Sequence, residues 1–492
     1  MINLNAGEPA SQNVSQGMKR LLQRNVPLAV VVVSCTLSSV VSAGTPFDPF
    51  RTDGALHRDT AGYNDPYGLD CAIPGGALTF PAAVNLALCR NPQTRNAWAT
   101  AHQQAAALGG AESAWVPTLS VTGGESRYYG EHADLNGNIV NTPQDTRDAT
   151  ATLAWTIYDF GNRSGRIKSA RSLMDAAAAT ATSVAQQTIR SVVLAYYGAV
   201  ADDSLLNAAK TTEDISAHSL EIARGLQEGG AGTRADVLQA ETAHAQAMLT
   251  RIQAEATAKG AHGTLAITLG LTADEGFRLE PEGIPKEIPA LTARMADLMA
   301  EAARQRPDLK AAQFQRDAAE ANITVARATG RPSIAFGAVH NFTSTTDVQN
   351  ENYNQIGVTI TWPLFTGFAS SYSVRQAQAS LQVQEANLEQ VGLTVTQDVW
   401  SSYYNLDSAN QQLTVTAGLT KTADDNLEVA LGRYQAGVGT IVDVLTAQTA
   451  AATSRQLRIN AELGWKVARA ALALALGRLS SAEPLSNAEL LP

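Results

Sequence analysis

The 492-residue sequence lacks the motifs of the common enzyme classes. It contains no Gly-x-Ser-x-Gly nucleophile elbow, no phosphate-binding loop ending in Gly-Lys-Ser/Thr and no His-Glu-x-x-His zinc motif. The seven histidines are scattered, and none stands at a short metal-ligand spacing from another. We therefore expect no enzyme activity, no catalytic or cofactor-binding residue, no metal ligand and no cofactor.

Long apolar runs are also missing. Beyond the first 43 residues, no stretch reaches about 18 consecutive apolar residues, so no membrane-spanning helix is predicted. The formal net charge of −10 has the wrong sign for a nucleic-acid partner. These absences exclude a helical membrane protein and argue against nucleic-acid binding.

The one short apolar run lies near the N-terminus, in an arrangement typical of export signals. Lys19, Arg20 and Arg24 precede the apolar residues 27–33, and Val41-Ser42-Ala43 offers a small-residue cleavage site. We predict that residues 1–43 are a signal peptide. Lipid attachment at Cys35 is the alternative, because residues 32–35 loosely fit a lipid-attachment box.

Cysteine is scarce, with three residues in the whole chain. Cleavage after Ala43 would leave only Cys71 and Cys89. Two neighbouring cysteines in an exported protein are expected to form a disulfide, and two free buried thiols are the alternative. Pairing would close a loop of about 18 residues, which contributes about 3 kcal/mol in the chain-entropy model.

Proline is absent from Gln144 to Glu280 and from Leu364 to Glu483, and both stretches are rich in good helix formers. A helix from about Arg163 to Leu226 would be roughly 95 Å long. Apolar residues recur every seven positions in the second stretch, as in a coiled coil, at Val374, Leu381, Leu388 and Val395. A plain antiparallel helix bundle is the alternative.

Glycine-rich breaks divide each proline-free stretch into two helices. Residues 228–232 and 436–439 end the long helices, and Thr233 and Thr440 then begin patterns close to a capping box. Each break is therefore expected to be a hairpin between antiparallel helices. The returning helices should run to about Leu269 and Leu476.

Apolar and polar residues alternate, with the period of a β-strand, in four segments. The segments are 118–123, 148–158, 333–339 and 355–362. They predict one β-hairpin in each half of the chain. Four strands leave open edges, whereas three chains would supply 12 strands, a number that an outer-membrane barrel permits. Aromatic residues gather at these strands, and Trp155 and Trp362 are candidates for a membrane interface. A simple preference of aromatics for strands is the alternative.

The two halves are copies of one unit. Trp155 and Trp362, residues 230–240 and 437–447, and Leu269 and Leu476 are each 207 positions apart. Pro92 and Pro117 recur 215 positions later, so the first copy has eight extra residues between Pro117 and Trp155. Besides the signal peptide, we predict an N-terminal periplasmic segment at 44–77, a first repeat at 78–280, a second repeat at 281–480 and a C-terminal tail at 481–492.

The duplicated units, with Gly-x-Gly-Thr-x-x-Asp-Val-Leu-x-Ala in both copies, resemble the TolC-type outer membrane factor family from about Leu78 to Leu479. The cysteine pair and residues 87–92 further resemble members that serve type I secretion of toxins, such as the cyclolysin secretion outer membrane protein. The resemblance implies a mostly α homotrimer. Its 12-stranded β-barrel would lie in outer membrane lipid, and an α-helical barrel would continue from it across the periplasm. The expected partners are a periplasmic membrane-fusion adaptor and an inner-membrane ABC or proton-driven pump.

The resemblance also implies a periplasmic gate at the helix tips. The matching gate positions are Asp236, Tyr434 and Asp443, and the tip turns are at Gly230, Gly232, Gly437 and Gly439. This chain has Gly439 where some members carry arginine and Thr446 where some carry aspartate, so the familiar ion-pair lock is in doubt. Arg234 is our hypothetical replacement. Helix capping alone is the alternative role for both aspartates.

The cargo stays open at this stage. Type I protein secretion is one interpretation, and multidrug efflux with a proton-driven pump is another, because the pump selects the cargo of a shared conduit. A periplasmic coiled-coil adaptor would also use long helical hairpins, without membrane strands.

Overall fold

The computed structural model describes residues 48–56, 71, 76–134, 136–280, 283, 294–346 and 349–479. The predictions for the signal peptide, for Cys35 and for the tail at 481–492 lie outside the described residues. The fold below is that of the unit that begins at Phe50.

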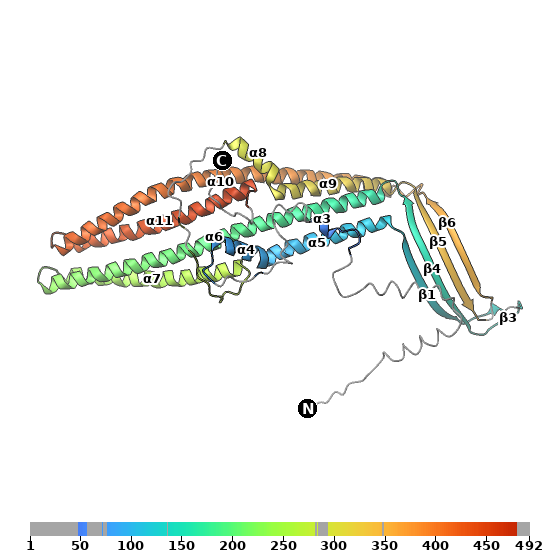
Figure 1. The fold of residues 1–492 in the computed structure, drawn as a ribbon, viewed down its shortest axis with the longest axis horizontal. Helices are drawn as coiled ribbons and strands as arrows, with labels where there is room; N and C mark the ends of the chain where they lie inside the picture. The colour runs from blue at the N-terminus through green and yellow to red at the C-terminus, as the bar shows by residue number, and fades with distance from the viewer. Residues whose placement is uncertain are drawn as a thin grey trace, which may run out of the picture. The chain divides into compact units, whose positions relative to one another are not determined.

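Two helices of 67 residues each form the frame of the protein, α6 (Asn162–Glu228) and α10 (Ala369–Gln435). Each turns back into a shorter antiparallel helix, α7 (Arg234–Thr268) or α11 (Ile441–Leu476) (Figure 1). At 1.5 Å per residue, the long helices extend about 100 Å. The long helical hairpins predicted from the proline-free stretches are confirmed. No described helix has an apolar stretch long enough to cross a membrane.

Each copy also has a pair of shorter helices ahead of its strands. The first copy has α4 (Phe80–Arg90), α5 (Pro92–Glu112) and a short 3₁₀ helix, η3 (Ser113–Trp115). The second copy has α8 (Met295–Gln305) and α9 (Pro307–Ala328). Pro92 and Pro307 each occupy the first turn of a helix, where a missing N–H costs nothing. A further short helix, α3 (Asp53–Leu56), precedes them all.

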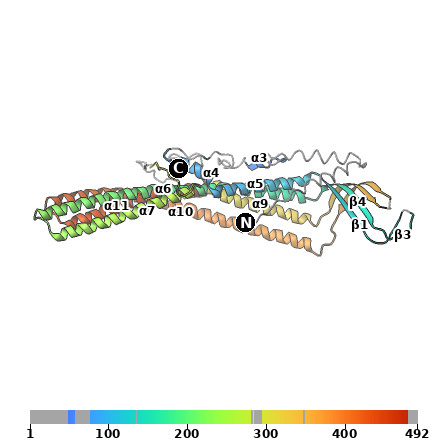
Figure 2. The same ribbon diagram turned by 90° about the horizontal axis from the view of Figure 1, so that it is seen from below.

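The four main strands form one antiparallel sheet in the order β1-β4-β5-β6. They are β1 (Thr118–Tyr128), β4 (Gln144–Tyr158), β5 (Ser333–Thr345) and β6 (Glu351–Thr361). The hairpin of each copy joins the other through β4 and β5, with Trp155 opposite Phe336. The sheet and the two helix tips lie at opposite ends of the long helices, as both views show (Figures 1 and 2).

The strands of both hairpins reach further from the helices than the sequence predicted, to residues 128, 144, 345 and 351. In the first hairpin the added ends contain charged residues in place of apolar ones, so the alternating pattern is lost there. Arg147 pairs with Glu125 at 2.9 Å, and Arg127 pairs with Asp145 at 3.3 Å, across β1 and β4. The eight extra residues predicted for the first copy fall where the small sheet of β2 (His132–Ala133) and β3 (Ile139–Val140) lies.

The turn from the sheet into each long helix has the same unusual backbone in both copies. Phe160 and Gly161 have φ of 53° and 99°, and their counterparts Gly367 and Phe368 have φ of 61° and 68°. The glycine has exchanged places with the phenylalanine between the copies. Both turns therefore hold a bulky residue in the left-handed region, which costs free energy and fixes the direction of the helix.

A buried arginine holds the sheet to the helices in the first copy. The side chain of Arg163 pairs with Asp159 at 3.0 Å and donates to the carbonyl oxygen of Ile157 at 2.9 Å. Its guanidinium also lies 4.1 Å from the ring centroid of Trp115. These contacts compensate the burial of the cation and connect β4, η3 and α6.

The returning helices end against a corner of their own copy. Gly270 and Gly477 have φ of 78° and 75°, as in a left-handed helix cap. A Cβ on Gly270 would lie 2.7 Å from the carbonyl oxygen of Arg90, and one on Gly477 would lie 3.0 Å from the carbonyl carbon of Gln305. The two largest apolar clusters surround these corners.

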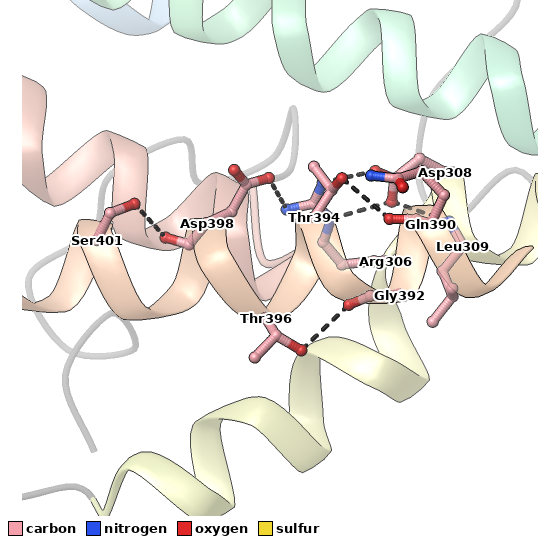
Figure 3. Close-up of polar contacts among 9 residues, drawn as sticks. All are labelled: Arg306, Asp308, Leu309, Gln390, Gly392, Thr394, Thr396, Asp398 and Ser401. Atoms are coloured by element: carbon pink, nitrogen blue, oxygen red, sulfur yellow. Dashed lines mark hydrogen bonds and ion pairs between the residues drawn. The ribbon is translucent and has the colours of Figure 1, made fainter. Parts of the chain in front are cut away.

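The corner of the second copy carries a partly buried ion-pair cluster (Figure 3). Arg306 donates from Nη1 to Asp398 of α10 at 2.8 Å and from Nε to Asp308 at 2.9 Å. Burial alone would raise the pKa of Asp308, but the hydrogen bonds and charge of Arg306 outweigh it and hold that pKa below its usual range. The first copy has Asn91 at the matching corner, which donates to the carbonyl oxygen of Thr268 at 2.9 Å.

The predicted disulfide is present. Cys71 is bonded to Cys89 of α4, with 6.0 Å between their Cα atoms. Arg90 donates to the carbonyl oxygen of Cys71 at 3.0 Å. The alternative of two free thiols is therefore wrong, and the disulfide fastens the segment before α4 to the first copy.

We predict that Gly270→Ala lowers the thermal midpoint of the purified protein. The alanine would occupy a left-handed conformation, which costs about 1–2 kcal/mol, and would also crowd Arg90. Gly198→Ala in the interior of α6 is the control, because a Cβ there meets nothing within 4 Å and alanine favours a helix. Circular dichroism measures the thermal midpoint of each variant. Equal midpoints for the two variants would contradict this role of Gly270.

Candidate functional site

The tips of the two helical hairpins share one turn geometry, and glycine is required in it. Gly230 and Gly437 have φ of 76° and 74°. A Cβ on Gly232 would lie 3.0 Å from the backbone nitrogen of Gln227, and one on Gly439 would lie 3.1 Å from that of Tyr434. The first glycine of each pair thus supplies the left-handed turn, and the second permits a close approach to the preceding helix.

Both aspartates of the predicted gate cap a helix. Thr233 donates its backbone N–H to Asp236 Oδ2 at 2.9 Å, and Asp236 returns a bond to Thr233 Oγ1 at 3.2 Å. Thr440 and Asp443 repeat the arrangement at 3.1 and 3.2 Å. Hydrogen bonds from Thr440 hold the pKa of Asp443 below its usual range. Each carboxylate thus completes a capping box, with Asp in place of the usual Glu.

An apolar cluster joins the two tips. Tyr434 of α10 is only 4% exposed and packs in the same cluster as Leu220 of α6, Val237 of α7 and Ile441 of α11. Its hydroxyl is buried without a hydrogen-bond partner among the described residues. Burial, and secondly the charge of Asp236, raise the pKa of Tyr434. The structure therefore packs Tyr434 of the second copy against Val237, the neighbour of Asp236, in the first copy.

Arg234 lies in the first turn of α7, and its side chain is exposed. Within the described part of the chain, no ion pair joins Arg234 to Asp236, whose carboxylate is engaged by Thr233. The ion pair across this hairpin nearest the tip is instead that of Arg224 with Glu241, at 2.7 Å, and Arg251 pairs with Glu213 further from the tip, at 2.6 Å. The gate roles of Asp236, Tyr434, Asp443 and Arg234 stay predictions.

One buried polar contact between the hairpins had no signal in the sequence. Gln448 of α11 donates to Ser219 Oγ of α6 at 2.6 Å, and both side chains are buried. The two residues are 229 positions apart, and neither belongs to a recognisable motif. Such a contact fixes the register of the hairpins, because a buried amide without a partner would cost free energy.

In the half nearest the helices, the sheet has one apolar and one polar face. The register places Leu119 of β1 opposite Leu153, which lies opposite Ala338, which lies opposite Ile356 of β6. The adjacent row, on the other face, contains Ser120, Thr152, Val339 and Gln355. An apolar outer face and a polar inner face are the pattern of a transmembrane barrel strand.

The two candidate tryptophans lie where the sheet meets the helices. Trp155 is 41% exposed near the end of β4, and its Nε1 donates to the carbonyl oxygen of Trp115 at 3.0 Å. Trp362 directly follows β6 and is 61% exposed. Their position at one end of the apolar face suits a membrane interface, and that role stays a prediction.

The outer strands of the sheet are open. Every residue of β1 and of β6 is exposed, and each strand pairs on one side only among the described residues. An open edge with apolar side chains is a template for pairing with another chain. Among the described residues, no group of three or more His, Cys, Asp or Glu side chains is placed to hold a metal ion.

Comparison with known proteins shows which family shares this architecture. The sequence profile of the outer membrane efflux protein family matches residues 83–271 and 298–478. Protein CyaE of Bordetella pertussis is 30% identical over 82% of this chain and 84% of its own length. The pyoverdine export outer membrane protein OpmQ of Pseudomonas aeruginosa is 24% identical over 79% of this chain and 84% of its own.

Solved structures share the fold. The outer membrane protein VceC of Vibrio cholerae superposes with a TM-score of 0.68 at 19% identity, over 81% of this chain and 96% of its own. The apolar sheet face, the long helical hairpins and the profile matches in both halves all point to the same family. The chain belongs to the outer membrane efflux protein family, whose members are channels that reach from the outer membrane into the periplasm.

Proposed function

We propose that three copies of this chain form a passive conduit across the outer membrane and the periplasm. The open, two-faced sheet carries this proposal. Three sheets joined edge to edge supply 12 strands, with the apolar face toward lipid and the polar face toward a water-filled lumen. The helices α6, α7, α10 and α11 continue the tube into the periplasm, where an adaptor and an inner-membrane pump deliver the substrate.

The helix tips are the proposed gate. Tyr434 packs in one apolar cluster with Val237, the residue next to Asp236, and so brings the second copy into contact with the first at the tips. Opening would draw the α10–α11 tip away from the α6–α7 tip, which exposes Tyr434 and breaks the apolar cluster around it. Asp443 and Arg234 lie on the same tips and are proposed to meet neighbouring subunits there.

The proposed cargo is protein delivered by a type I secretion pump. The support is the similarity to CyaE over most of both chains, together with the cysteine pair near the mature N-terminus. Drug efflux is the second candidate, because the probable efflux pump protein TtgC of Pseudomonas putida is 26% identical over 73% of this chain.

We expect the protein to remain in outer membranes until detergent is added, and then to migrate on gels as a heat-sensitive trimer. Boiling should convert the trimer band to a monomer, because a closed barrel resists detergent at low temperature. Release by salt or alkali without detergent, with no trimer band, would instead indicate a periplasmic coiled-coil adaptor.

Asp236→Ala should raise the single-channel conductance in planar bilayers, because it removes a charge and a capping bond beside Tyr434. Glu221→Ala on the neighbouring helix α6 is the control, since the side chain of Glu221 is 83% exposed and pairs with His218 at 3.6 Å on the surface of the same hairpin. Conductance and ion selectivity that match the unmodified channel would remove Asp236 from the gate.

Deletion of the gene should abolish release of a large secreted protein and leave drug susceptibility unchanged. The expected genetic neighbours are an ABC transporter and an adaptor. Increased drug susceptibility with normal protein release, beside genes for a proton-driven pump, would support the second candidate.

A further inference from the structure

The duplication makes one contact within the chain a template for a contact between chains. Helix α6 of the first copy lies antiparallel to α11 of the second. Gln186 donates to the carbonyl oxygen of Gly477 at 3.1 Å, and Lys466 Nζ lies 4.3 Å from the ring centroid of Tyr197. Between these contacts, Val193 and Ala470 are both buried in the same cluster.

The copies of these residues lie 207 positions away, on helices at the edges of the protomer. Tyr197 corresponds to Tyr404 of α10, and Lys466 corresponds to Lys259 of α7. The surrounding motif Arg-Ile-x-Ala-Glu-x-x-x-Lys is also repeated, at 251–259 and 458–466. Its internal ion pairs recur as well, from Arg251 to Glu255 at 3.2 Å and from Arg458 to Glu462 at 2.7 Å.

The edge surface of α10 is apolar and exposed. Trp400, the counterpart of Val193, is 51% exposed, and Tyr404 is 50% exposed. Their rings lie 5.1 Å apart and form one aromatic patch. Large aromatic side chains in such a patch are typical of a protein interface.

The edge surface of α7 carries smaller side chains than the matching face of α11, whereas that of α10 carries larger side chains than the matching face of α6. The α11 residues on the matching face are Leu463, Val467, Ala470 and Leu474. Their counterparts on α7 are Ala256, Gly260, Gly263 and Ile267. A Cβ on Gly260 would meet nothing within 4 Å, and one on Gly263 would only make ordinary contact with Ala273 at 3.8 Å, so the described part of one chain does not require glycine at either position. A glycine in a helix interior weakens the helix, which a contact with another chain would explain.

We infer that α10 of one subunit packs on α7 of the next as α6 packs on α11 within the chain, with Trp400 seated over Gly260 and Gly263 of the partner subunit. In the same register, Lys259 of the partner subunit lies over the ring of Tyr404. The occupant of the exposed patch is thus a second copy of this chain. The inference rests on the proposed trimer and specifies the contact that holds it together at mid-length.

The exchange of volume also makes the contact selective. Trp400 is too large for the space opposite Ala470, and Val193 would leave a void over Gly260 and Gly263. Contacts within a chain and between chains are therefore not interchangeable, although the backbones repeat. This difference fixes which helices become neighbours when three chains assemble.

Cysteine cross-linking tests the register directly. In outer membranes, the double variant Lys259→Cys/Tyr404→Cys should give covalent dimers and trimers on denaturing gels after oxidation. The matched control Lys466→Cys/Tyr197→Cys should cross-link within one chain and stay monomeric, because that contact is intramolecular. Monomers from the first pair, in a protein that still forms the heat-sensitive trimer, would overturn the inference alone. Absence of any trimer in the unmodified protein would overturn the proposed function and the inference with it.

A second variant tests the space over Gly260 that the inference assigns to Trp400. Gly260→Leu should strengthen α7 as an isolated helix yet lower the temperature at which the trimer dissociates, because the leucine occupies the place of Trp400. Adding Trp400→Val should restore that temperature. Gly464→Leu, in the interior of α11 and free of neighbours within 4 Å, should leave it unchanged. A dissociation temperature unaffected by Gly260→Leu would contradict the packing.

Discussion

An unpaired strand edge cannot remain open in a bilayer, and the rest of this structure depends on that constraint. In hydrocarbon, each backbone N–H and C=O needs an internal partner. The sheet of this chain has an apolar face suited to lipid, but β1 and β6 have open outer edges. Four strands cannot close on themselves, so the edges require other copies of the chain. The trimer and the tube both follow from this requirement.

Duplication explains why the tube is built from similar units, and the differences between the copies distinguish contacts within a chain from contacts between chains. Both copies repeat the left-handed turns into the long helices, the glycine tips and the close corners at Gly270 and Gly477. The corners nevertheless use different chemistry, an amide at Asn91 and an ion-pair cluster at Arg306. The exchange of Val193 for Trp400 lies on α10 at the protomer edge, where we infer that one copy recognises the next chain rather than its own.

Much of this fold could be predicted from local signals. Proline-free stretches, glycine turns and capping threonines set the helix ends to within a few residues, because each signal acts on its own stretch of backbone. The outer ends of all four strands were missed, and in β1 and β4 the ion pairs of Glu125 and Arg127 replace the apolar pattern that marks a strand. The approach of Tyr434 to Asp236 and the bond from Gln448 to Ser219 depend on packing between distant segments, which no local pattern contains. The repeat boundaries at 78–280 and 281–480 and the gate roles stay predictions.

Single-particle imaging of the protein purified from outer membranes tests the central claim most directly, because it shows which strand lies beside each open edge. We expect a threefold-symmetric particle in which β6 of each chain is hydrogen-bonded to β1 of the next and the barrel continues into a helical tube. A particle in which β1 and β6 of one chain meet each other, or in which both edges remain unpaired, would contradict the account.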